Sequence, residues 1–112
     1  MADNKFQGEQ KDHDYLRVEF YSQTATVLWK NLQPQFAKGI VVEIALGLDL
    51  VEVATQLSLD NNHQFQTWIA EKKVARVTDE TAQRWFDSNK ELWTVVAPPW
   101  VLVQMTEPDL SS

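Results

Sequence analysis

Residues 91–104 form a dense run of apolar and β-branched side chains that a Pro98-Pro99 pair divides into two parts. The run contains two of the five tryptophans, and such a segment must be buried in a core or used as a contact surface. Because both prolines fix φ near −65°, they cannot form a two-residue type I′ or II′ hairpin loop. We therefore expect either a wider loop or one extended segment that kinks at a sheet edge or a bulge.

Helical and strand periodicities alternate along the rest of the chain. Apolar residues at three- and four-residue steps predict a helix over residues 14–30, and β-branched residues predict a strand over 40–46. Gly39, after a short helical turn, is expected at positive φ. Three more helices are predicted over residues 49–58, 61–72 and 79–88, with Asp49, Asp60 and Thr78 as caps. The sequence therefore predicts an α+β domain, with a small sheet of three to four strands and about four helices packed mainly on one face.

A single domain is expected over residues 14–105. Residues 1–13 are polar and lack periodicity, which predicts a flexible N-terminal tail, and residues 106–112 predict a short C-terminal tail. The first residues lack the apolar segment of a signal peptide, and no apolar run approaches the roughly 20 residues of a membrane helix. Together with the absence of cysteine, these features favour a cytoplasmic protein without a membrane segment.

Motifs for catalysis or cofactor binding are not evident in the sequence. The chain has no cysteine and only three glycines, and its two histidines, His13 and His63, are far apart. These features argue against a thiolate nucleophile, a Gly-rich phosphate loop and a metal site. Glu43 lies among aliphatic residues of a predicted strand, where burial would raise its pKa. We expect no cofactor, no metal and no catalytic residue, with an enzyme that uses a carboxylate near Glu43 as an alternative.

The net charge of −6 disfavours nucleic acid and membrane surfaces as partners, because phosphate groups and anionic lipids repel an acidic chain. Trp93 and Trp100 flank the two prolines, and aromatic residues are enriched at interface hot spots. An exposed edge there would also suit strand addition by a partner. We therefore predict a non-enzymatic, acidic protein-binding domain, an assembly factor or regulator, whose contact residues are Trp93, Pro98, Pro99 and Trp100.

A nucleic-acid-binding regulator is the alternative function. Two predicted helices within residues 49–72 are followed by basic residues, similar to the helices and wing of some DNA-binding proteins. The second of these helices contains no Arg or Lys before Lys72, although phosphate contacts need cations. The basic residues that would contact phosphate are Lys72, Lys73, Arg76 and Arg84.

Several motifs within residues 29–104 resemble those of a known family. The fullest are Leu48-Asp-Leu-Val-Glu-Val-Ala54 and Pro99-Trp-Val-Leu-Val-Gln104, and Trp29, Trp68, Trp85 and Trp93 add single matches. The chain resembles the domain of unknown function 2288 family, a small bacterial family of uncharacterised proteins. It departs from the family pattern at Pro98, before Pro-Trp. The resemblance implies one compact bacterial domain, and it carries no activity, cofactor or catalytic residue to this chain.

Overall fold

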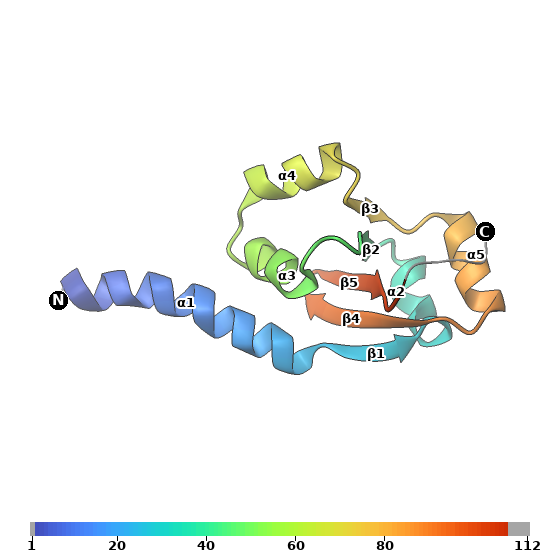
Figure 1. The fold of residues 1–112 in the computed structure, drawn as a ribbon, viewed down its shortest axis with the longest axis horizontal. Coiled ribbons are helices and arrows are strands. Elements are labelled where there is room, and N and C mark those ends of the chain that lie inside the picture. Colours follow the sequence, from blue (N-terminus) through green and yellow to red (C-terminus); the bar gives the residue numbers. More distant parts are fainter. Residues whose placement is uncertain (1, 108–112) are drawn as a thin grey trace.

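The computed structural model describes residues 2–107 as a mixed five-stranded sheet with helices on both faces (Figure 1). The long helix α1 (Ala2–Gln23) comes first and extends beyond the rest of the molecule. The remaining elements are β1 (Ala25–Leu28), the 3₁₀-helix η1 (Trp29–Leu32), α2 (Gln33–Ala37), β2 (Val41–Ile44), α3 (Leu50–Ser58), α4 (Asn62–Ala70), β3 (Val74–Arg76), α5 (Asp79–Asp87), β4 (Glu91–Ala97) and β5 (Trp100–Met105).

The strand order across the sheet is β1-β4-β5-β2-β3. β2 and β5 are parallel, and the other neighbouring pairs are antiparallel. The predicted α+β class is confirmed. The described residues contain five strands and five α-helices, more than the three to four strands and about four helices that we expected. The edge strand β1, of four residues, accounts for the extra strand.

Two apolar clusters lie on opposite faces of the sheet. Successive residues of a strand point to opposite faces, so Leu102 faces one cluster, while Val101 and Val103 face the other. Phe20 of α1, α3 and Trp68 of α4 cover the Leu102 face, and η1, α2 and α5 contribute to the cluster on the other face. The expectation that helices lie mainly on one face is therefore only partly right.

The N-terminal region differs from the prediction in two ways. Residues 2–13, expected to be a flexible tail, lie in the first half of α1, and the helix ends at Gln23 instead of continuing to residue 30. Thr26 and Val27 are β-branched, a side-chain shape that favours extended backbone, and β1 pairs with β4 there. The predicted C-terminal tail lies mostly outside the described residues. None of the described helices has both the length and the apolar character needed to cross a membrane.

Polar side chains cap three of the helices. Asp49 accepts hydrogen bonds from two backbone N–H groups of α3, at 3.0 and 3.3 Å, and Thr78 accepts one from α5 at 3.1 Å. The predicted cap Asp60 is wrong, because Asn61 caps α4 with a bond of 3.2 Å. Asp60 instead has φ of 63° in the turn after α3, and Gly39 has the expected positive φ.

The β4–β5 hairpin is tighter than we expected. Pro98 and Pro99 alone connect Ala97 to Trp100, which face each other across the ladder, and the peptide bond between the prolines is cis. A cis proline at the third position defines a turn class separate from types I′ and II′. Both expected alternatives, a wider loop and a kinked single segment, are therefore wrong. The prolines lie beyond the last paired residues, so they remove no hydrogen bond from the sheet.

Candidate functional site

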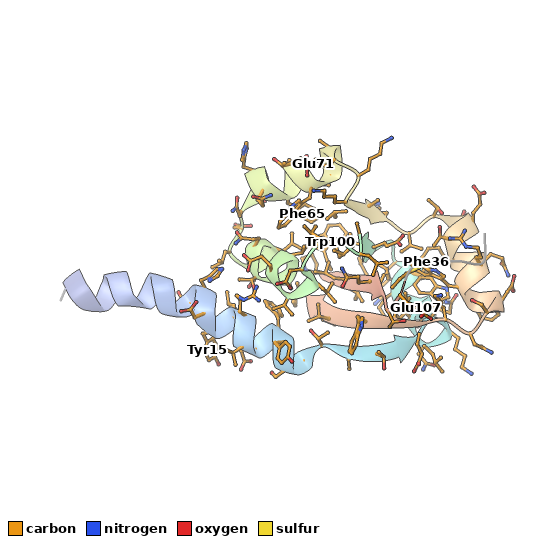
Figure 2. All side chains as sticks on the ribbon, viewed as in Figure 1. Tyr15, Phe36, Phe65, Glu71, Trp100 and Glu107 are labelled. Carbon is orange, nitrogen blue, oxygen red and sulfur yellow. The ribbon has the colours of Figure 1, made fainter. Side chains whose placement is uncertain are left out.

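A groove of about 630 Å³ lies between α4 and the β3 edge of the sheet. This α4–β3 groove falls within the roughly 300–1,000 Å³ typical of small ligand sites. Figure 2 shows two of its aromatic residues, Phe65 and Trp100, between α4 and β5. Most of the residues that line it are apolar, and the full set is Val42, Phe65, Gln66, Ile69, Lys72, Val74, Ala75, Arg76 and Trp100.

The side chains of this groove come from α4, β2, β3 and β5, with Lys72 in the turn after α4. Phe65 and Ile69 are four residues apart on α4, so they share one side of the helix, and Trp68 between them is buried in the core. Trp100 begins β5 on the sheet face of Leu102 and packs against the core beneath α3 and α4. The α4–β3 groove is the part of this sheet face that α4 leaves open, and 42% of Ile69 remains exposed there.

Two cations line the groove, from the turn after α4 and from β3. The Arg76 guanidinium lies 5.7 Å from the centre of the Trp100 ring, within the range of a cation–π contact. Lys72 lies in the turn that leads from α4 to β3. Among the described residues that line the groove, none is acidic, and nearby Glu71 pairs with Lys73 at 3.4 Å. The groove is therefore locally basic in a chain of net charge −6.

The structure brings together residues from both predicted sites. Trp100, from the predicted protein-binding set, lines the groove with Lys72 and Arg76, from the nucleic-acid set. Pro98 and Pro99 are exposed at the adjacent hairpin tip. Sequence reasoning missed the role of α4, because the spacing of Phe65 and Ile69 predicts an apolar stripe but not the part of it that stays uncovered.

Trp93 lies apart from Trp100, at the other end of the hairpin. It is 42% exposed and lines a second groove of about 620 Å³ with Tyr21 of α1 and residues of the α3 N-terminus. Tyr15, Val18 and Tyr21 are exposed at three-residue steps along α1, so the apolar surface around this Trp93 groove continues onto that helix. The segment 91–104 therefore contributes to two separate surfaces and not to one.

Arg84 and Glu43 lie away from the α4–β3 groove. Glu43 shares a strand face with Ala75 and Val103, which is the face opposite Trp100. Burial raises the pKa of the Glu43 carboxyl, and the positive charge of Arg84 lowers it in part. Glu43 is absent from the lining of the α4–β3 groove, of the Trp93 groove and of a smaller groove beside Phe86. Within the described part of the chain, no three His, Asp or Glu side chains form a potential metal site.

The family model described as "Protein of unknown function (DUF2288)" matches residues 15–105. The chain belongs to the DUF2288 family. This result confirms the resemblance noted in the sequence, and every residue that lines the α4–β3 groove lies within the matched range. The NMR solution structure of PA1075 from Pseudomonas aeruginosa is similar, with a TM-score of 0.74 and 31% sequence identity over 88% of this chain and 91% of that chain. No curated protein matches the sequence.

Proposed function

We propose that this DUF2288 domain is a protein-binding module, acting as an assembly factor or regulator rather than as an enzyme, and that its partner docks in the α4–β3 groove. The observation that carries the proposal is the combination of half-buried Phe65 and Trp100 with the exposed side chain of Ile69 around one cavity. The lack of cysteine and the resemblance to a bacterial family support a role in the bacterial cytoplasm.

The chemistry of the groove matches that of protein interfaces. Interface hot spots are enriched in tryptophan and arginine, and they lie in pockets from which a partner can exclude water. Trp100 and Arg76 are stacked at such a pocket. A partner side chain that filled the groove would cover exposed apolar area on Ile69 and complete the packing around the indole ring.

Protein binding is favoured over nucleic-acid binding by the distribution of positive charge. Arg84, one of the four cations in the nucleic-acid set, belongs to α5 on the opposite face of the sheet. Lys73 pairs with Glu71, which reduces its availability for phosphate. The two cations left in the groove stand beside an apolar cavity, an arrangement better suited to a peptide side chain than to a phosphate backbone.

The test compares the tryptophans of the two grooves. The tagged wild-type domain is used to capture partners, and the recovered partner is purified and titrated against Trp100→Ala, Ile69→Ser and Trp93→Ala variants. We expect Trp100→Ala and Ile69→Ser to weaken binding at least ~tenfold, as hot-spot substitutions do, and Trp93→Ala to bind like wild type. Circular dichroism confirms that each variant is folded. Equal affinity for wild type and for a folded Ile69→Ser variant would remove the α4–β3 groove as the site.

A further inference from the structure

We propose that the partner segment recognised by the α4–β3 groove is an extended acidic peptide with an aliphatic side chain, and that it binds by adding a strand to β3. This inference rests on the proposed function, because it specifies the chemistry and the binding mode of the partner at the same groove. Three features carry it: the open backbone edge of β3, the apolar cavity beside that edge, and the two cations that line the cavity.

β3 is the terminal strand of the sheet, and its hydrogen bonds to β2 show which residues face outward. In an antiparallel pair, alternate residues direct both backbone groups toward the partner strand. Lys73 accepts a bond from the chain just after β2 at 2.8 Å, and Val77 donates one to β2 at 3.5 Å. The backbone N–H and C=O groups of Ala75, midway between them, therefore also point toward β2. Val74 and Arg76 direct their N–H and C=O groups away from it, toward the open edge of the sheet.

The cavity lies where the side chains of an added strand would fall. The side chains of Val74 and Arg76 belong to the sheet face that α4 covers, and both line the α4–β3 groove. In a strand paired with β3, every second side chain would point to this same face. An aliphatic residue at such a position reaches Ile69 and Trp100, and backbone pairing with alternate side-chain pockets is the usual mode of strand addition.

The charge of the edge selects an acidic partner. Arg76 and Lys72 both line the groove, and none of the described residues that line it is acidic. Charged side chains on an edge strand prevent pairing with another copy of the same edge, because like charges would then face each other. A partner strand with carboxylates on the groove-facing side would instead place negative charges next to these cations, and the two strands would attract each other. Arg76 on the edge strand therefore disfavours pairing with a second β3 strand, and both cations favour an acidic segment.

The test uses designed peptides and the ¹⁵N-labelled full-length protein. The probe acetyl-Ser-Glu-Thr-Leu-Thr-Glu-Ser-amide places two carboxylates and one leucine on a single face of a strand. A permuted control, acetyl-Ser-Glu-Leu-Thr-Thr-Glu-Ser-amide, has the same composition with leucine on the other face. A third peptide replaces both glutamates of the probe with lysine, and oligothymidine serves as the nucleic-acid probe.

We expect the acidic probe to slow hydrogen exchange at the outward amides of Val74 and Arg76 and to shift the indole signal of Trp100. Thr26 and Leu28, the outward residues of the opposite edge strand β1, provide matched amides that should not change. The permuted and lysine peptides should bind ~tenfold more weakly, because they lose the leucine contact or two charge contacts. A Lys72→Glu, Arg76→Glu double variant should prefer the lysine peptide.

Four results would each overturn the inference. In the first two, hydrogen exchange at Val74 and Arg76 is unchanged, or the lysine peptide or oligothymidine binds the wild type more tightly than the acidic probe does. In the other two, the double variant still prefers the acidic probe, or the acidic probe does not bind at millimolar concentration. The proposed function fails separately, when a purified partner binds a folded Ile69→Ser variant as tightly as the wild type. Partner binding that depends on Ile69, together with any of the four results, would keep the groove and reject the acidic strand.

Discussion

Glu43 is half-buried in the sheet, where the charged form of its carboxyl is unfavourable. It lies on β2, a strand that β3 and β5 flank, and burial raises its pKa despite the nearby charge of Arg84. A raised pKa in the folded state means that the folded protein binds a proton more tightly than the unfolded chain does. The free energy of unfolding therefore decreases as the pH rises from the ordinary pKa of about 4.5 through the folded-state pKa.

Replacing Glu43 with glutamine removes this cost while keeping the shape of the side chain. We expect Glu43→Gln to unfold at a higher urea concentration than wild type at pH 7. The difference should shrink toward zero near pH 4, where the Glu43 carboxyl is largely protonated in both the folded and the unfolded protein. Glu91→Gln, at an exposed position of β4, is the control and should change little at either pH. A Glu43→Gln midpoint below that of wild type at pH 7 would show that the attraction of the Arg84 charge outweighs burial.

α1 is attached to the body of the protein by an ionic cluster at the start of α3. Arg17 donates hydrogen bonds to Glu52 and to Asp49, the latter at 3.2 Å, and His13 lies 3.3 Å from Glu52. Hydrogen bonds to Glu52, the largest cause, and to Asp14 raise the pKa of His13. Burial raises the pKa of Glu52, but hydrogen bonds from Gln56, His13 and Arg17 outweigh this effect and lower it.

The cluster predicts that the docking of α1 depends on pH. Because the pKa of His13 is raised on folding, its contribution is complete below the ordinary value of 6.5 and is lost as the pH rises through the folded-state pKa. The lowered pKa of Glu52 keeps that group charged throughout this window. We expect amides near His13 to exchange faster at pH 8.5 than at pH 6, after correction for intrinsic rates. A His13→Gln variant should lose this dependence, and a variant that retained it would assign the effect to another group.

Much of the arrangement of elements follows from local sequence, and the exceptions have physical reasons. Asp49 and Thr78 cap helices as expected, because a polar side chain before an apolar helical stripe favours that structure, although at α4 the cap is Asn61 and not the predicted Asp60. β1 was predicted as part of a helix, because Trp29 and Leu32 continue the helical spacing of apolar residues. In the structure these two residues are buried from η1 and not from a longer α1. The α4–β3 groove depends on which part of an apolar stripe remains open, a property that only the packing of distant segments decides.

For the whole molecule, the structure predicts different roles for the two halves of α1. The cluster beneath α3 includes Phe20 and contacts Leu16, and among the side chains that the structure describes, His13 is the first to form an ionic contact with α3. A chain that starts at Asp12 keeps all of these contacts, and we expect it to unfold at the same denaturant concentration as the full chain. A chain that starts at Ala25 should lose at least about 3–5 kcal/mol of unfolding free energy, because removing one buried phenylalanine alone usually costs that much. A large loss in the longer variant would show that residues before Asp12 stabilise the domain.

The central position of β5 has a consequence for how the molecule is made. β5 lies between β4 and β2 and contributes to the cores on both faces of the sheet. The ribosome nevertheless synthesises it after the other four strands of the sheet. Until Val101 and Leu102 leave the exit tunnel, β2 has no parallel neighbour and the earlier elements cannot close around a shared centre. Folding of this domain is therefore expected to be completed only after β5 has left the exit tunnel.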